Sequence, residues 1–497
     1  GLCRDYTIIP AAKFPEAVCR VSLPCPHSPF TGPSAGGNVS QRAACPANEE
    51  ETGSNRFEIH RECLIRLFRN SSIPVLAVLQ SRDFRFLWTA RSIHEVSRRM
   101  ELLVLGYLIL SMTDSAFQVG LIAVFLNLPR PALALFAGLL ADRLDRRRIL
   151  IWAHATYLGL ATAILLLLIT GVIQPWHIFM IVLVQGAARV TDDPARRTAI
   201  FDLAGHEHIT GAMSLETMTN NWGRILGPLA GGVLIAGTGF TGAYAVIVAF
   251  DLAALLLITR MQLPHQAQAS GSGRSMARDM REGLEHSLNN RMVLGVLSMS
   301  LIVNALVFPI QYFIPVIASD LLLVGPVLGG LLGSAEGIGT LIGALVIGMK
   351  KDIRYHGRLF CAGALTVASA VALIAWSPWF ALSFALLSFG GLGQAGFSTM
   401  QSTILLLETR PEMRGRVMGA QGTVNGLGHL IGGSEIGAVA SALGIGVAIG
   451  INAGAGLILI LMVIALTPLI RRQVGTVLGG TISAADAPTI TEPGSDE

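Results

Sequence analysis

The sequence is poor in charged and aromatic residues. Asp, Glu, Lys and Arg make up 14% of its 497 residues and Phe, Trp and Tyr 6%, whereas hydrophobic residues make up 52%. A soluble protein carries about 25% charged residues, and the mean hydropathy of this chain is +0.59. The composition therefore excludes an ordinary soluble protein and indicates an all-α protein that crosses the lipid bilayer several times.

Several signatures of enzymes and pumps are missing from the sequence. None of the six cysteines forms a CxxC pair, and there is no HExxH motif and no GxxxxGK[ST] phosphate loop. These absences argue against a metal site, a membrane-embedded enzyme and a nucleotide-driven pump, so we expect no catalytic residues and no cofactor. The net charge of +4 comes from arginines confined to particular loops, which fits membrane topology and not nucleic-acid binding.

Residues 1–80 differ from the rest of the chain. They are rich in Pro, Gly, Ser and charge without a sustained apolar period, which predicts a disordered cytoplasmic extension. Arg56–Arg69 alternates basic and apolar residues at helical spacing and is predicted to lie along the inner membrane surface. The start lacks the pattern of a signal peptide, and residues 471–497 are predicted to form a disordered tail.

Twelve apolar segments of membrane-spanning length follow. We predict transmembrane helices at about 85–112, 117–140, 149–171, 175–197, 212–236, 240–261, 292–318, 324–349, 358–376, 379–405, 415–440 and 444–470. Lys and Arg are concentrated in alternate loops, whereas the loops around Thr113, Gln174, Gly239, Asp320, Ser377 and Leu443 have none. By the positive-inside rule, both termini are cytoplasmic in a bacterial inner membrane.

The spans divide into two related halves. The longest internal loop, residues 262–291, is predicted to be a cytoplasmic linker between six-helix bundles at 81–261 and 292–470. Gly138, Asp142 and Arg148 are matched 210 residues later by Gly348, Asp352 and Arg358. A second match pairs Asn220, Gly223 and Gly227 with Asn425, Gly428 and Gly432, 205 residues later. Two matches in the same order at nearly one offset predict pseudo-symmetric halves.

Ionisable and polar residues inside the spans are the candidates for transport chemistry, because each costs at least ~2.5 kcal/mol at the bilayer centre unless it faces a cavity or a partner. Arg98 and Glu101, three residues apart, are expected to pair on the cavity face. The candidates for the substrate cavity are Arg98, Arg130, Arg224, Asn220, Asn425 and His429. For Arg224, Asp251 and His429, a purely structural role is at least as well supported by the sequence.

Four carboxylates are candidates for proton coupling. Glu336 is the first choice because it lies among glycines with no basic residue one turn away, which favours a buried carboxylate able to exchange a proton. Glu101, Glu435 and Asp251 follow.

Two glycine-containing patterns suggest conformational roles. The turn GLLADRLDRRR, residues 138–148, contains Gly138, Asp142, Arg143 and Arg147 and is a candidate gate, although its arginines also fix topology. In the fifth span, Gly223, Gly227 and Gly231 share one face on which another helix can pack closely, and Pro228 removes a backbone donor. Simple helix packing explains these glycines equally well.

These motifs resemble the major facilitator superfamily. The turn at 138–148 is similar to its loop signature between spans two and three, and GRILGPLAGG, residues 223–232, is similar to the motif associated with its antiporters. SRDFRFLW (81–88), DDPARRTAI (192–200), GLLGSAEGIGTLIGAL (330–345) and RGRVMG (414–419) resemble an exporter group that includes enterobactin and macrolide efflux proteins. One departure stands out: the arginine often found three residues before a Gln-Gly pair in span four is replaced here by Val182.

The resemblance implies a monomeric secondary transporter that works by alternating access. We expect export of an amphipathic small molecule, either a drug-like compound or a siderophore-like metabolite, in exchange for protons. A lipid or lysophospholipid translocator and an uncoupled facilitator of the same fold are the alternatives.

Overall fold

The computed structural model describes residues 78–130, 133, 145–263, 290–349, 355–410 and 413–470. The chain divides into Gly1–Glu62 and Cys63–Glu497, and every described residue lies in the second unit. The tail predicted at 471–497, residues 1–77 of the extension predicted at 1–80 and residues 264–289 of the linker predicted at 262–291 lie outside the described residues. At the end of the predicted extension, Val78 is buried.

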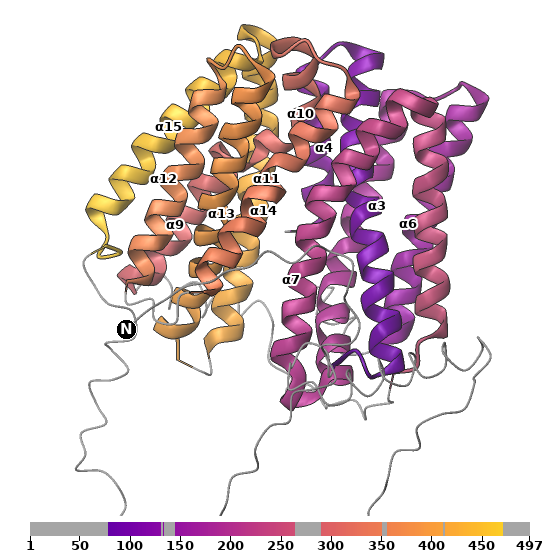
Figure 1. Ribbon diagram of the computed structural model, residues 1–497, viewed down its shortest axis with the longest axis horizontal. Helices are drawn as coiled ribbons and strands as arrows, with labels where there is room; N and C mark the ends of the chain where they lie inside the picture. Colours follow the sequence, from indigo (N-terminus) through magenta and orange to yellow (C-terminus); the bar gives the residue numbers. More distant parts are fainter. Residues whose placement is uncertain are drawn as a thin grey trace, which may run out of the picture. The chain divides into compact units, whose positions relative to one another are not determined.

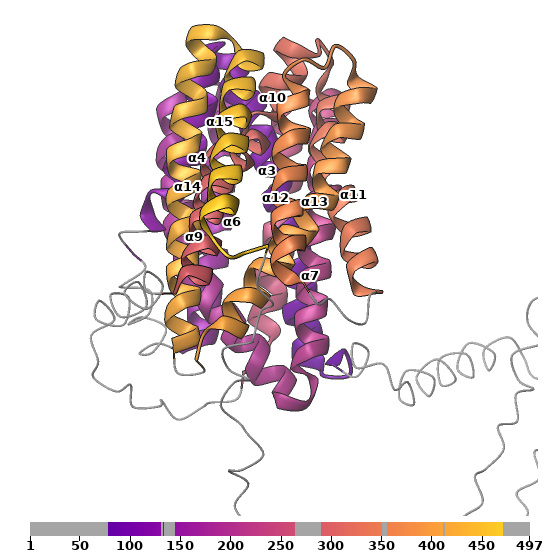
Figure 2. The same ribbon diagram turned by 90° about the vertical axis from the view of Figure 1, so that its left-hand side faces the viewer.

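All the regular structure in the described ranges is helical, as the sequence predicted. The first half contains α3 (Arg82–Thr113), α4 (Ala116–Asn127), α6 (Arg146–Thr170) and α7 (Pro175–Arg260). The second half contains α9 (Arg291–Leu306), the short turns η1 (Phe308–Tyr312), α10 (Ile314–Val316) and η2 (Ile317–Leu321), and then α11 (Pro326–Gly348), α12 (His356–Ile374), α13 (Phe380–Glu408), α14 (Arg414–Leu443) and α15 (Ile445–Leu466). Figures 1 and 2 show these helices running side by side.

The helix α7 covers the fourth, fifth and sixth predicted spans. Its backbone is helical except at Gly205 and Gly239, where φ is 67° and 71°. These left-handed conformations suit glycine, and they reverse the chain at the two places where the sequence predicted loops. Pro228 lies within the fifth span, where the dihedral angles remain helical.

The seventh predicted span is not one continuous helix. The sequence predicted a helix over 292–318, but α9 ends at Leu306 and is followed by η1, α10 and η2. Pro309 and Pro315 lack the N–H groups that would continue the helical ladder, so the helix is interrupted there. This break places Gln311 and Tyr312 in the wall of the central cavity.

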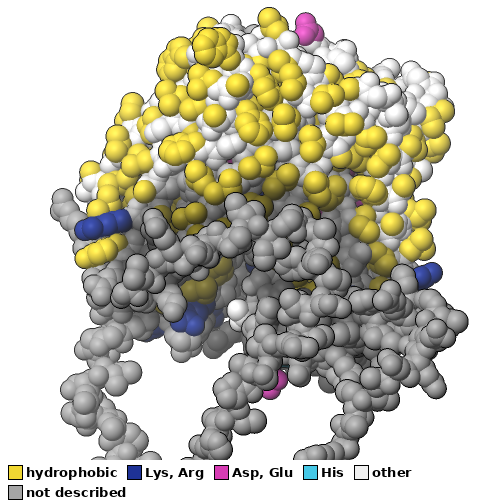
Figure 3. All heavy atoms as spheres, in the orientation of Figure 1, with side chains coloured by type: hydrophobic (Ala, Val, Ile, Leu, Met, Phe, Trp, Pro, Cys, Tyr) yellow, Lys and Arg dark blue, Asp and Glu magenta, His cyan; other side chains and the backbone are white. Residues whose placement is uncertain are grey.

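The surface of the described helices suits a lipid environment. Among the described residues, seven helices are long and apolar enough to cross a membrane, and α4 is a shorter apolar helix. On the face drawn in Figure 3, hydrophobic side chains predominate among the described residues. Exposed residues include Trp152, Trp376, Leu345 and Ile458, each more than 60% exposed, because lipid and not protein is their natural neighbour.

Glycines at equivalent positions of the two halves make equivalent contacts. In the fifth span, a Cβ atom added at Gly227 would lie 2.5 Å from Arg99 Cβ of α3. In α14, a Cβ added at Gly432 would lie 1.9 Å from the Ala305 oxygen of α9. Span five therefore packs on span one as span eleven packs on span seven, which is the arrangement that the 205-residue offset predicted.

The two halves meet closely near the end of the spans that lacks basic loops. A Cβ at Gly232 would lie 2.3 Å from the Pro326 oxygen, and one at Gly120 would lie 2.3 Å from the Gly433 oxygen. Near the opposite end, added Cβ atoms at Gly348, Gly415, Gly419 and Gly422 would meet no described atom within 4 Å. We call the first of these the closed end.

Candidate functional site

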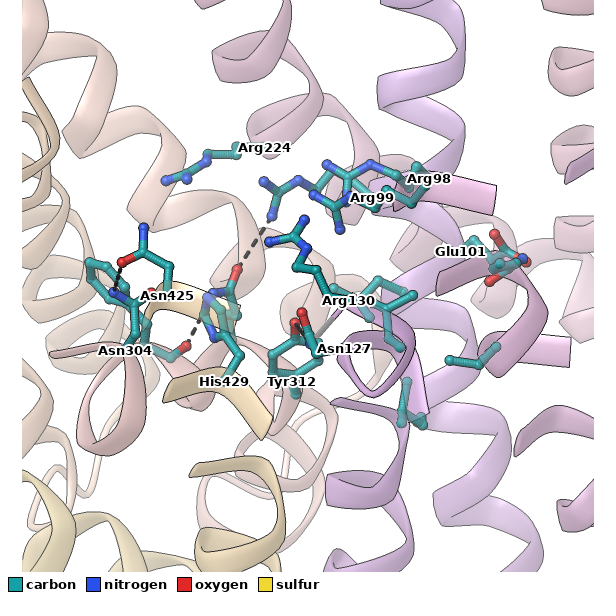
Figure 4. Close-up of a pocket in the computed structure, with 18 of the residues that line it drawn as sticks. Arg98, Arg99, Glu101, Asn127, Arg130, Arg224, Asn304, Tyr312, Asn425 and His429 are labelled. Carbon is teal, nitrogen blue, oxygen red and sulfur yellow. Dashed lines mark hydrogen bonds between the residues drawn. The ribbon is translucent and has the colours of Figure 1, made fainter. Parts of the chain in front are cut away.

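A cavity of about 290 Å³ lies between the two halves. Its wall is formed by α3, α4, α6 and α7 of the first half and by α9, η1, α13 and α14 of the second (Figure 4). The cavity brings together five of the six residues predicted to line it: Arg98, Arg130, Arg224, Asn425 and His429. The sixth, Asn220, is not among the lining residues, and its side chain donates to the Glu216 carbonyl oxygen at 2.9 Å.

A fully buried carboxylate binds three arginines of α3. Glu95 has no exposed surface and forms ion pairs with Arg91 at 2.9 Å, Arg99 at 3.2 Å and also Arg98. The predicted Arg98–Glu101 pair is therefore wrong. Long side chains in a helix lean toward its N-terminus, so Arg98 reaches back to Glu95 three residues earlier.

Glu101 takes part in a separate contact. Its carboxylate accepts a 2.8 Å hydrogen bond from Gln185 Nε2 of α7, and both residues line the cavity. Val182, at the position where the superfamily pattern often has an arginine, lines the cavity one turn earlier on α7. Arg189, one turn after Gln185, supplies a cationic group instead.

A histidine–aspartate pair lies next to these residues, with His94 in the cavity lining and Asp251 outside it. His94 Nδ1 is 3.1 Å from Asp251 Oδ1, and both side chains are buried. The His94 ring also stacks on Tyr157, with centroids 4.6 Å apart, and lies 4.9 Å from the His154 ring. Asp251, predicted as a proton-coupling candidate, thus has a specific partner from α3.

The wall from the second half consists of amides and aromatic rings. Asn304 Nδ2 donates to Asn425 Oδ1 at 3.3 Å, and Gln401 donates to Ser300 Oγ. The Phe308 and Phe397 rings meet edge to face at 5.7 Å. Two buried atoms of lining residues, Gln394 Oε1 and His429 Nδ1, have no hydrogen-bond partner among the described residues.

Polar bonds join the halves near the middle of the spans. Arg224 Nη1 is 3.3 Å from Glu336 Oε1, and Arg99 Nη1 donates to Gln311 Oε1 at 3.3 Å. Ser334 Oγ donates to the Ile225 oxygen at 2.6 Å. Glu336 has no basic neighbour in its own helix, as expected, but it is only partly buried and it pairs with an arginine of the other half, which the sequence did not reveal.

The remaining predicted residues lie elsewhere. Glu435 accepts a 3.2 Å hydrogen bond from Asn452 of α15 and does not line the cavity. Arg147 donates to the Thr259 oxygen at 2.6 Å, within the first half. The gating candidates Gly138, Asp142 and Arg143 lie outside the described residues, as does Asp352, a further conformational candidate that matches Asp142 in the second half.

The glycine face of the fifth span packs on α3. Cβ atoms added at Gly223 and Gly231 would lie 2.5 Å from Glu95 Cγ and 3.2 Å from Met100 Cγ. These glycines therefore let α7 approach the segment of α3 that carries Glu95, Arg98 and Arg99, as helix packing at such spacing requires.

Sequence reasoning missed Glu95, Arg189 and His94. All three lie inside predicted spans, so the rule that singled out Arg98 and Glu101 would also have selected them. No group of three or more His, Cys, Asp or Glu residues is placed to hold a metal ion in the described part of the chain.

This fold, with a cavity between two pseudo-symmetric halves, is that of a major facilitator transporter. The family model described as "Transmembrane secretion effector" matches residues 73–477, and the chain belongs to that family. Among curated relatives, the enterobactin exporter EntS of Salmonella typhi is 27% identical over 394 residues, covering 76% of this chain and 90% of the relative. EntS of Shigella flexneri is 27% identical over 369 residues, covering 72% and 85%.

Solved transporter structures share the fold at low sequence identity. The nucleoside transporter NupG has a TM-score of 0.60 at 17% identity, covering 79% of this chain and all of that one. A bacterial homologue of the human lysosomal transporter Spinster, inward-facing and unoccupied, has a TM-score of 0.60 at 13% identity, covering 81% and 97%. These relatives and neighbours are transporters and not enzymes, and the chain is a multi-pass membrane efflux transporter.

Proposed function

We propose that the protein exports an amphipathic small molecule by alternating access, in exchange for protons. The observation that carries the proposal is the cavity between the halves, lined from both sides by charged, amide and aromatic groups. A site built from both halves is loaded and emptied when they rock against each other. The enterobactin exporters among the relatives favour a siderophore-like metabolite over a drug-like compound as substrate.

The glycine contacts of the closed end support the rocking motion. Helices that touch through backbone atoms at Gly232 and Gly120 form a close contact at this end. The contact separates when the halves rock and this end opens. With the positive-inside orientation, the closed end faces the periplasm and the cavity is reached from the cytoplasm of a bacterial cell. The turn at 138–148 is then a cytoplasmic latch that closes after the substrate has bound.

Glu336 is the proposed coupling carboxylate, since it is the acidic group paired across the halves. Protonation removes its negative charge and weakens the pair with Arg224. One ion pair between the halves then depends on proton binding, and this dependence links protonation to the movement of the halves.

Everted membrane vesicles with an acidified interior test the proposal. A substrate drawn from a panel of siderophore-like and drug-like compounds is expected to release protons from the vesicles, seen as dequenching of a pH-sensitive dye. Glu336→Gln should abolish this release while the protein remains inserted. The exposed Glu207→Gln variant is the matched control. Normal release by Glu336→Gln would contradict the coupling assignment, and no release with any compound would contradict proton antiport.

A translocator of anionic lipids is the second candidate, favoured by the arginines of the cavity. Guanidinium groups bind phosphate through paired N–H donors. This function requires the cavity to open sideways to the bilayer, and it predicts scrambling or export of lysophospholipid in vesicles that lack a pH gradient. An uncoupled facilitator would move its substrate equally well without the gradient.

A further inference from the structure

The charges of the central cavity all lie on one wall. Five arginines line it, and each comes from the first half: Arg98, Arg99, Arg130, Arg189 and Arg224. Glu101 is the acidic residue of the lining and belongs to the same half, whereas the second half contributes no Asp, Glu, Lys or Arg to the described lining. In Figure 4, the guanidinium groups of Arg98, Arg99, Arg130 and Arg224 project from their helices toward the cavity.

The ion pairs of these arginines leave positive charge in excess. In the described structure, one network joins six arginines to four carboxylates: Arg91, Arg98, Arg99, Arg130, Arg189 and Arg196 with Glu95, Asp192, Asp193 and Glu216. Arg224 and Glu336 form a separate pair. Glu101 does not join it by an ion pair, and its carboxylate faces Gln185. A membrane-embedded site with unbalanced cations is costly unless an anion enters it.

Two of the five cavity arginines have the longest ion-pair distances. Arg130 and Arg189 approach the same Asp193 oxygen at 3.7 and 3.8 Å, beyond hydrogen-bonding distance. Their side chains are 30% and 31% exposed, whereas Arg91 in the same network is 9% exposed. Their N–H groups are therefore available to a ligand.

The opposite wall suits a neutral, partly aromatic body. Asn304, Asn425 and Gln394 offer amide groups, and Phe308 and Tyr312 add aromatic rings. Gln394 Oε1 and His429 Nδ1 are buried polar atoms without a hydrogen-bond partner among the described residues.

We infer that the substrate is an amphipathic organic anion. Its acidic group binds the arginines of the first half, and its uncharged aromatic or amide-bearing body binds the second half. This inference rests on the proposed function and narrows its substrate class. A lipophilic cation is disfavoured because it would face five guanidinium groups. The acidic group could belong to a soluble compound or to a lipid headgroup, and the aromatic wall favours the soluble aryl compound.

Calorimetric titration of the purified protein in phosphatidylcholine nanodiscs tests the inference. The probes share a naphthyl body and differ in their head group: naphthylacetate is anionic, naphthylacetamide neutral and naphthylethylamine cationic. Naphthylacetate should bind saturably and at least about tenfold more tightly than the amide, because a charge-assisted hydrogen bond replaces a neutral one. The amine should not bind. Equal binding of the amine, or saturable binding of none of the three, would overturn the inference.

Variants locate the binding. Arg130→Gln and Arg189→Gln should each weaken naphthylacetate binding about tenfold or more, and the Lys substitutions should retain most of the affinity. Arg260→Gln removes an exposed arginine outside the cavity and should change nothing. Unchanged affinity in both cavity Gln variants would place the anion elsewhere and refute the site. Because the three probes are compared on the unaltered protein, a variant that fails to fold leaves the main test intact.

Two further arms separate the related hypotheses. Binding of lysophosphatidylglycerol together with failure of naphthylacetate to bind would overturn the soluble aryl anion in favour of a lipid headgroup. Arginine-dependent naphthylacetate binding without proton release in any vesicle assay would refute the proposed antiport while supporting the anion site. Proton-coupled export restricted to cations would support the proposed antiport and refute the anion site.

Discussion

Gly232 allows a direct test of the contact that joins the two halves at the closed end. A Cβ atom added there would lie 2.3 Å from the Pro326 oxygen and 2.9 Å from Gly330 Cα. In Gly232→Ala the backbones of α7 and α11 must separate by roughly 1 Å to restore ordinary contact distances. Gly330→Ala makes the reciprocal change, since its Cβ would lie 2.4 Å from the Pro228 oxygen.

The expected effect is a shift in the conformational equilibrium. Overpacking a tight contact costs about 1–3 kcal/mol, and the cost applies only while the end is closed. The ratio of closed to open molecules at this end should therefore fall about 5- to 150-fold. The substrate would then meet a cavity that is reached more often from the other face.

Electron–electron distance measurements check this shift. Spin labels at Thr241→Cys and Val327→Cys mark exposed positions of the two halves near the closed end, in a protein whose six native cysteines are replaced by alanine. The distance distribution should gain a longer component in Gly232→Ala. Gly237→Ala is the matched control, because its Cβ would meet nothing within 4 Å. An unchanged distance distribution in both Gly232→Ala and Gly330→Ala would refute the role of this glycine contact in keeping the end closed.

Two further predictions concern the buried carboxylates of the first half. Glu95→Gln should lower the free energy of unfolding by about 3–5 kcal/mol, because three arginines lose their shared counter-ion; thermal unfolding in detergent checks this, and a melting temperature like that of Glu207→Gln would contradict it. Asp251→Asn should leave proton release in everted vesicles intact, because the amide still bonds His94 and coupling is assigned to Glu336; loss of release by an inserted, stable Asp251→Asn variant would move the coupling role to the His94–Asp251 pair.

The sequence predicted features of the site that depend on a single residue in a span, and it did not predict which residues contact each other. Intramembrane charge identified Arg98, Arg130 and Arg224, since an ionisable group in a span needs a cavity or a partner wherever the helix lies. The sequence did not show which carboxylate each arginine pairs with. Arg98 has carboxylates at both i−3 and i+3, and only the direction of the side chain selects Glu95 over Glu101. Asn220 has the sequence position of a cavity residue, but its side chain bonds its own helix.

By itself, the sequence determined the class of this protein. Apolar runs of about 20 residues, turns at Gly205 and Gly239, and two glycine motifs 205 residues apart are local or periodic features, and they lead to a duplicated helical membrane protein. Tertiary structure alone decided which charges meet. Arg224 and Glu336 are 112 residues apart and pair only because glycines allow α7 and α11 to touch. The gathering of all cavity charge on one wall likewise follows from how the helices rotate against each other, which no hydrophobic period specifies.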